Sequence, residues 1–146
     1  MLELLKDSDK RLRRKSKRVS KIDDEIRSIA ASLVDTMNSN NGVGLAAPQC
    51  GILKRIIVVL VDNQPQVMIN PEIITTSQET CNMEEGCLSF PGKYLTITRP
   101  EKITVKYRNI SGHPMQETYD GLNARILFHE IDHLDGILFE ERFNND

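Results

Sequence analysis

Apolar residues recur at two different spacings along the chain, and these spacings predict its secondary structure. Between residues 22 and 37 they recur every three or four positions, which is the repeat of a helix with one buried face. The residues concerned are Ile22, Ile26, Ile29, Leu33 and Met37. Asp23 or Ser20 can cap the start of this helix, and the polar run Asn40, Asn41, Gly42 predicts its end.

β-branched and alternating apolar residues predict strands in the middle of the chain. We expect these strands at 54–62, 66–74, 94–98, 102–108 and 115–119. Residues 75–92 show little periodicity and are expected to form a loop. A second helix is predicted for residues 121–134, with Asp120 as its N-cap and Asp135-Gly136 as its stop. The order of elements predicts an α+β fold with mainly antiparallel sheets around this helix.

The composition is that of an ordinary globular protein. The 146 residues are 39% hydrophobic and 27% charged, and the formal net charge is -2. A chain of this size is expected to form one domain, residues 1–146, around one core. No apolar run approaches the roughly 20 residues that a membrane span requires, and the N-terminus lacks the apolar stretch of a secretory signal. We therefore expect a cytoplasmic protein without membrane contact.

The segment HEIDH, residues 129–133, is the strongest candidate for chemistry. Residues four apart lie on one face of a helix, so His129 and His133 can both direct a ring nitrogen at one metal ion. Glu130 lies beside that ion and is placed to take a proton from water, as in HExxH hydrolases. The chain has only three histidines, and two of them occupy this spacing. We therefore predict a metal site rather than two surface or core histidines.

A catalytic metal site of this kind needs a third protein ligand. The acidic residues downstream of HEIDH are poorly placed for it; they are Asp135, Glu140, Glu141 and Asp146. Upstream, His113 lies in a turn, and three cysteines remain, Cys50, Cys81 and Cys87, whose odd number argues against disulfides. Cys87 stands between Gly86 and Pro91-Gly92, in an irregular segment that can bring a thiolate to an ion. We therefore predict Cys87 as the third ligand.

Three segments together resemble the signature motifs of the peptide deformylase family. They are GVGLAAPQ at 42–49, EGCLS at 85–89 and HEIDHLDG at 129–136, in the same order and with similar separations as in that family. The resemblance extends over nearly the whole chain. It implies a metal-dependent hydrolase that removes the N-terminal formyl group from formyl-methionine of nascent polypeptides and releases formate.

The resemblance also implies a role for each residue of the site. The metal ligands would be Cys87, His129 and His133. The ion would be Fe²⁺, with Zn²⁺ a frequent replacement. Glu130 would act first as general base and then as general acid. The Gln49 side-chain amide and the Leu88 backbone N–H would stabilise the oxyanion that forms at the substrate.

A pocket for the methionine side chain is implied in the same way. Its lining would comprise Val43, Met83, Leu122, Arg125 and Ile126. Gly44 fits this picture, because a chain that passes close to a substrate has no room for a side chain. Glu85 and Arg99 match an ion pair that braces the cysteine loop.

Two features depart from the family pattern. Phe128 stands before the first metal histidine, where many members have Gln, so any hydrogen bond of that amide is absent. The sequence stops at Asp146, so we expect a short form without the long C-terminal helix of many bacterial members. The basic segment KRLRRKSKR at residues 10–18 is then our candidate for a weak, salt-sensitive ribosome association. We expect the protein itself to be a monomer.

Two other functions are compatible with HEIDH. A metallopeptidase would hydrolyse peptide bonds and would give Cys87 no role. A non-catalytic metal-binding module would close the fourth position of the ion with Cys50 or His113. Metal content and formate release from formyl-Met-Ala-Ser distinguish the three functions.

Overall fold

The computed structural model describes residues 1–143, so the candidate ligand Asp146 lies outside the described residues. Two α-helices occur within that range, α1 (Asp24–Ser39) and α2 (Gly121–Leu134). The strands are β1 (Gly44–Ala46), β2 (Ile56–Val61), β3 (Gln64–Thr76), β4 (Thr80–Cys87), β5 (Phe90–Pro100), β6 (Lys102–Arg108) and β7 (Pro114–Asp120). Short 3₁₀ helices lie at Lys10–Arg13, Ala47–Cys50 and Phe139–Arg142.

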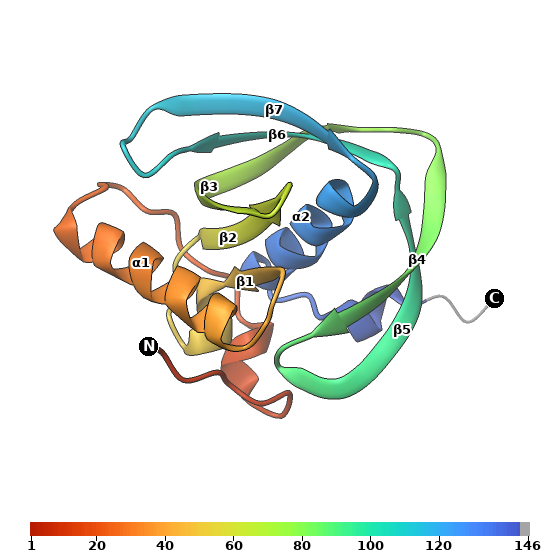
Figure 1. The fold of residues 1–146 in the computed structure, drawn as a ribbon, viewed down its shortest axis with the longest axis horizontal. Coiled ribbons are helices and arrows are strands. Elements are labelled where there is room, and N and C mark those ends of the chain that lie inside the picture. Colours follow the sequence, from red (N-terminus) through yellow and green to blue (C-terminus); the bar gives the residue numbers. More distant parts are fainter. Residues whose placement is uncertain (144–146) are drawn as a thin grey trace.

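The strands form two separate antiparallel sheets (Figure 1). One sheet has five strands in the order β1-β2-β3-β6-β7, and the other consists of β4 and β5 alone. Helix α2 packs against β1, β2, β6 and β7, whereas α1 packs against β1 and β2. The prediction of an α+β fold with antiparallel sheets around the HEIDH helix is therefore confirmed.

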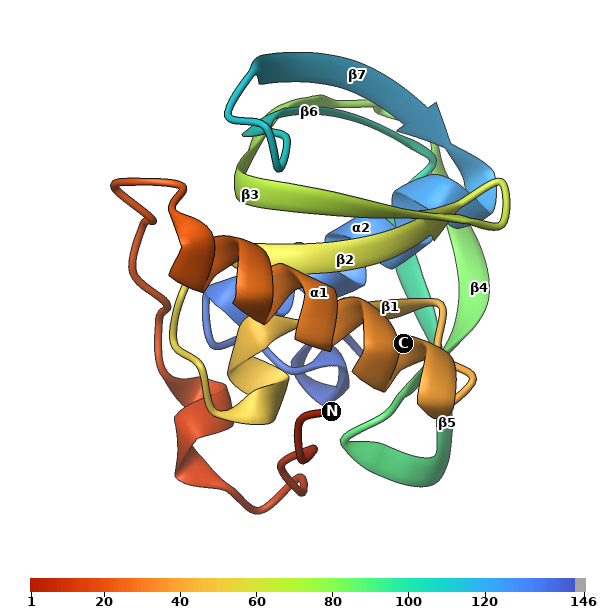
Figure 2. The same ribbon diagram turned by 60° about the vertical axis from the view of Figure 1, so that its left-hand side comes forward.

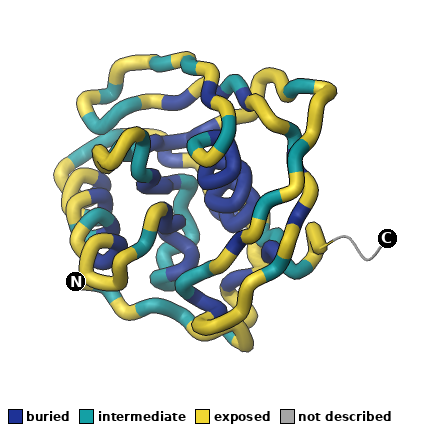
Figure 3. The backbone as a smooth tube through the Cα atoms, turned by 45° about the vertical axis from the view of Figure 1, so that its right-hand side comes forward, coloured by how far each residue is buried: buried dark blue, intermediate teal, exposed yellow. Residues whose placement is uncertain are grey.

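Helix α2 lies at the centre of the core. Every residue from Ala124 to Leu134 is buried, and Figure 3 shows this helix as a dark blue coil inside the molecule. Phe128 belongs to an apolar cluster with residues of the five-stranded sheet, among them Ile57, Val59 and Met68. Burial of each large apolar side chain contributes about 2 kcal/mol, so this cluster fixes the helix against the sheet. No helix within residues 1–143 has the length and hydropathy that crossing a bilayer requires.

The capping predictions were correct for one helix and only partly correct for the other. Asp23 is the N-cap of α1, and its side chain accepts a hydrogen bond from the Ile26 amide at 3.0 Å. Asp120 occupies the N-cap position of α2, but its side chain makes no capping hydrogen bond. The start of α2 therefore depends on packing rather than on a side-chain cap.

The prediction of a loop at 75–92 was wrong. Most of that segment forms β4 and the start of β5. Apolar and polar residues alternate only from Thr80 to Met83, and Glu84, Glu85 and Gly86 then interrupt the pattern, so β4 lacks the longer alternation that predicts a strand. Strand β1, in the Gly-rich segment, was also not predicted, because its three residues are all buried and show no alternation.

Candidate functional site

Three side chains from two elements meet in a group that can hold a metal ion. The ligand atoms of Cys87, His129 and His133 all lie within 4.8 Å of one another. The Cys87 Sγ is 3.4 Å from the Nε2 of His133. Within residues 1–143 no other group of three such side chains is found, so neither Cys50 nor His113 is placed to close the site.

The position of Cys87 depends on an irregularity in the β4–β5 pair. The register of the two strands shifts between Gly86 and Cys87. A shift of this kind re-aims a side chain that the regular alternation of a strand would direct elsewhere. Cys87 is therefore directed at the face of α2 that carries the two histidines.

Glu85 links the cysteine strand to the histidine helix. Its carboxylate oxygens accept hydrogen bonds from His129 Nδ1 at 2.9 Å, from two nitrogens of Arg99 at 2.5 and 2.9 Å, and from Arg125 Nη1 at 2.7 Å. Burial alone would raise the pKa of Glu85, but the hydrogen bonds from His129 and Arg99 outweigh burial and lower that pKa to about 2. A carboxylate on the far nitrogen of a ligand histidine fixes the ring, so Glu85 orients His129.

The same network continues to the C-terminal 3₁₀ helix. Arg99 Nη1 donates to Asp132 Oδ2 at 2.8 Å, and Arg142 makes two further hydrogen bonds to the Asp132 carboxylate, both 3.1 Å long. The ring of Phe139 lies 5.5 Å from the ring of His129 and 5.1 Å from that of Phe90. The segment that follows α2 therefore closes one side of the histidine pair.

Glu130 projects into the site as a buried carboxylate. Its Oε1 atom has no hydrogen-bond partner within the described structure. Burial raises the pKa of Glu130 to about 7. The backbone of Gly44 passes so close that a Cβ there would lie 2.7 Å from Glu130 Oε2 and 2.9 Å from Ile126 Cγ2. A residue other than glycine at position 44 would therefore displace the Glu130 carboxylate.

The Gln49 amide is held with its nitrogen toward the cysteine. Its Oε1 accepts a hydrogen bond from the Ala46 amide at 3.0 Å, which directs the Nε2 toward Cys87 Sγ at 3.5 Å and Ser89 Oγ at 3.3 Å. The Gln49 backbone carbonyl in turn accepts from the Leu5 amide at 2.7 Å. A donor with both ends of its amide fixed is preorganised for charge that develops beside it.

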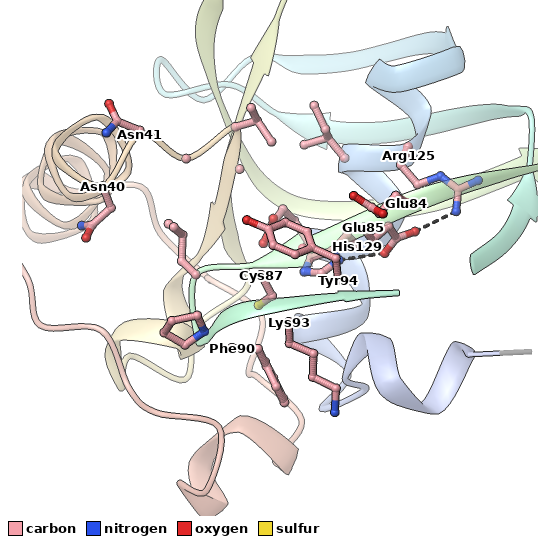
Figure 4. A pocket seen from close by; sticks show the side chains of 18 of the residues that line it. Asn40, Asn41, Glu84, Glu85, Cys87, Phe90, Lys93, Tyr94, Arg125 and His129 are labelled. Atoms are coloured by element: carbon pink, nitrogen blue, oxygen red, sulfur yellow. Dashed lines mark hydrogen bonds and ion pairs between the residues drawn. The ribbon is translucent and has the colours of Figure 1, made fainter. Parts of the chain in front are cut away.

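A cavity of about 450 Å³ opens onto these groups (Figure 4). Most of the residues predicted for the site line it: Val43, Gly44, Gln49, Cys87, Leu88, Leu122, Arg125, Ile126, His129 and Glu130. Met83 and His133 are not among the lining residues. Arg125 reaches the cavity, but its guanidinium is bound by Glu85 and by the carbonyls of Ile97 and Cys81, and Figure 4 shows it directed at Glu85.

Several residues of the site could not be predicted from their sequence context. Phe90, Lys93 and Tyr94 line the cavity from β5, and no motif singled them out. Asp132 did carry a signal, because an acidic residue on a helix expected to be buried requires a partner. Its partners, Arg99 and Arg142, come from distant segments; the sequence singled out Arg99 only as a partner of Glu85, and Arg142 not at all.

The comparisons with known proteins agree with this geometry. The family model of polypeptide deformylases matches residues 1–146. The peptide deformylase of a Picosynechococcus species is 49% identical over 99% of this chain and 80% of its own length, and that of a Synechocystis species is 47% identical with the same coverage.

Solved structures agree as well. The crystal structure of peptide deformylase from Thermotoga maritima superposes with a TM-score of 0.96 at 42% identity, covering 99% of this chain and 98% of that one. The Synechococcus elongatus peptide deformylase in complex with actinonin also gives a TM-score of 0.96, at 46% identity, with 99% and 79% coverage. The chain therefore belongs to the polypeptide deformylase family.

Proposed function

We propose that this protein removes the formyl group from the N-terminal formyl-methionine of nascent polypeptides and releases formate. The observation that carries this proposal is the convergence of the ligand atoms of Cys87, His129 and His133 beside a cavity that Cys87, His129 and the buried Glu130 line. Membership of the deformylase family supports the same reaction.

The residues present fit one divalent ion. Two imidazole nitrogens and one thiolate form a donor set that suits Zn²⁺ or Fe²⁺. Glu85 holds the Nδ1 of His129, which leaves the other ring nitrogen for the ion. We propose Fe²⁺ as the cofactor, with Zn²⁺ or another divalent metal able to replace it. When bound, the ion supplies a Lewis acid that polarises the formyl group and makes water more acidic.

Glu130 then carries out the proton transfers. Its carboxylate takes a proton from the attacking water and passes it to the methionine nitrogen as the C–N bond breaks and formate leaves. A group that both accepts and donates a proton works best with a pKa near the ambient pH, and burial brings the pKa of Glu130 to about 7. The Gln49 Nε2–H and the Leu88 backbone N–H stabilise the oxyanion between these two steps.

The shape of the cavity supports a preference for a formyl group on methionine. The carbon of a formyl group bears only hydrogen, whereas an acetyl group adds a methyl, and the space between Gly44 and Glu130 does not admit even a Cβ. Val43 and Leu122, each more than half exposed, and the buried Ile126 offer apolar surface to the methionine side chain. The partly exposed apolar residues become covered when the substrate binds, which favours binding.

The reaction is tested by incubating the metal-loaded protein with formyl-Met-Ala-Ser. We expect one formate per peptide and an intact Met-Ala-Ser product, and no release from acetyl-Met-Ala-Ser. Cleavage of a peptide bond in place of formate release would instead indicate a metallopeptidase. Stoichiometric metal with neither product would indicate a non-catalytic metal-binding module.

Replacing Gln49 by Leu is expected to lower kcat by about a hundredfold, with a much smaller change in KM. A hydrogen bond to the oxyanion acts mainly in the transition state, so its loss affects turnover more than substrate binding. Steady-state kinetics on formyl-Met-Ala-Ser measure both constants. Gln116→Leu, at an exposed position of β7, is the control and should match the wild type. A kcat within twofold of the wild type in Gln49→Leu would contradict the assigned role.

We further propose that the protein acts as a cytoplasmic monomer near the ribosome. All residues proposed for the reaction come from one chain, so no partner subunit is needed to complete the site. The substrates are formylated chains that emerge from ribosomes, so an enzyme held nearby meets them at higher local concentration.

A further inference from the structure

A second hollow, of about 540 Å³, lies in the surface and shares no lining residue with the cavity of the site. It is enclosed by the stretch that leads into α1, by β3 at Asn70 and by the end of β6 with the turn that follows it. Three basic residues from two of these segments, Arg18, Lys21 and Arg108, line it together with Ser111 and Gly112. The hollow therefore gathers positive charge from parts of the chain that are far apart in sequence.

The backbone around this hollow is held in place. Asn70 is buried, has a positive φ of 54°, and lies where the register of β3 and β6 shifts. Its side chain accepts a hydrogen bond from the Val19 amide and donates one to the Val19 carbonyl, both 2.8 Å long. On the other side, Arg108 Nη1 donates to the Gly112 carbonyl at 2.9 Å. The basic side chains therefore project from a fixed frame rather than from a flexible loop.

The hollow continues the basic segment that the sequence singled out. Eight of the 19 basic residues of the chain lie between Lys10 and Lys21, with no acidic residue among them. All eight are exposed, whereas Leu12, Ser16 and Val19 are buried and attach the segment to the body. Its backbone also bonds to the core, as in the Ser16 amide to the Leu134 carbonyl at 2.8 Å. The segment therefore presents a row of exposed cations on a backbone that is attached to the core.

Nearby acidic residues neutralise only part of this charge. Arg11 pairs with Asp9 at 2.9 Å, and Arg18 pairs with Glu72 at 3.0 Å. Within residues 1–143, neither Lys21 nor Arg108 forms an ion pair with a carboxylate. An excess of positive charge thus remains along the segment and at the hollow.

The surface around these cations favours the phosphate backbone of a nucleic acid duplex over other anionic partners. A lipid surface is bound by cations together with inserted apolar side chains, yet among the described residues none of the exposed large apolar side chains lies at 10–22 or 106–113. Single strands are held by exposed aromatic rings that stack on bases, and residues 10–22 contain no aromatic residue. A duplex needs only spaced cations that follow its phosphates.

We propose that segment 10–21 and the adjoining hollow bind the phosphate backbone of double-stranded RNA, without sequence preference, as exposed in the helices of ribosomal RNA. The choice of RNA rests on the proposed function, because formylated nascent chains are presented by ribosomes. In both Figure 1 and Figure 2 the stretch that leads into α1 lies on the left, and β4 and β5 lie on the right. RNA bound at the hollow and at the stretch that leads into α1 therefore lies away from the two strands that line the cavity.

The test measures binding of the whole protein to a fluorescent RNA duplex of about 20 base pairs, by anisotropy at about 50 and 200 mM KCl. We expect binding at the lower salt and its loss at the higher. Arg108→Glu should weaken binding about tenfold, and the triple variant Arg13→Glu, Arg14→Glu, Lys15→Glu should weaken it further, because both remove contacts to phosphate. The same variants should co-sediment less with ribosomes.

Lys102→Glu is the matched control, since it makes the same charge change at an exposed position at the opposite end of β6. It should bind RNA within about twofold of the wild type. All variants should release formate from formyl-Met-Ala-Ser at the wild-type rate, which shows that they are folded and tests the reaction separately from the RNA contact. No binding by the wild type, equal weakening by the control, or binding to phosphatidylglycerol vesicles without binding to RNA would each overturn the proposal.

Discussion

Replacing Glu130 by Gln is expected to lower kcat for deformylation by about a thousandfold while the bound metal is retained. The amide has the shape of the carboxylate but cannot take a proton from water, and general base catalysis contributes roughly a hundred- to ten-thousandfold. Glu130 is not among the three side chains whose ligand atoms converge, so its loss should leave them in place. Turnover of formyl-Met-Ala-Ser and metal content of the same sample measure the two effects.

The fold of the Glu130→Gln variant can be checked independently. Burial raises the pKa of Glu130 from 4.5 to about 7, so the buried carboxyl is easier to ionise in the unfolded chain than in the folded one. Glu130 therefore lowers the free energy of unfolding of the metal-free protein as the pH rises through that range. The metal-free variant should therefore unfold at the same temperature as the wild type or at a higher one above pH 7. Glu84→Gln, an exposed neighbour at the cavity, is the control and should keep its kcat. Wild-type turnover in Glu130→Gln would exclude the proposed proton transfer.

Loss of the thiolate is expected to abolish stable metal binding. Replacing a residue that only orients a metal ligand commonly lowers metal affinity ten- to a hundredfold. Cys87 is proposed as a ligand itself, so Cys87→Ala should lower the affinity by at least about a hundredfold. His129→Ala and His133→Ala should behave in the same way. Each purified variant is dialysed against a buffer that contains the free ion, and metal analysis then gives the number of ions bound per chain.

Two other cysteines provide controls for that experiment. Cys50 and Cys81 form no disulfide in the described structure and lie outside the converging group, so Cys50→Ala and Cys81→Ala should retain one metal per chain. Full metal in Cys87→Ala, or its loss in Cys50→Ala, would show that the ligand assignment is wrong. Loading with Fe²⁺, Zn²⁺ or Ni²⁺ then tests the identity of the ion, since the iron form should lose activity fastest in air.

The parts of the structure that could be predicted from sequence are those in which local pattern and burial agree. Helix α2 was predicted with its observed ends, because its apolar residues and the stop at Asp135-Gly136 both follow from local rules. The pairing of His129 with His133 follows from helix geometry alone. The antiparallel order of the strands follows from the short connections between them.

The rest depends on contacts between segments that are distant in sequence. The inward face of strand β4 carries the buried Glu85 among Cys81, Met83 and Cys87, and much of what holds this strand to α2 is the hydrogen-bond network of Glu85. Met83 was expected in the pocket, but it is not among the residues that line the cavity. The contact of Arg142 with Asp132 belongs to a network whose members become partners only once the chain has folded.

The two sides of the proposed metal group differ in how much of the protein must open to separate them. His129 and His133 belong to a helix that is buried from Ala124 to Leu134, so moving them requires local unfolding of the core. Cys87 belongs to a two-stranded sheet with many exposed residues, which can open at lower free energy. An ion shared by both sides would act as a cross-link between a rigid element and a mobile one, and release of the ion would begin at the sulfur.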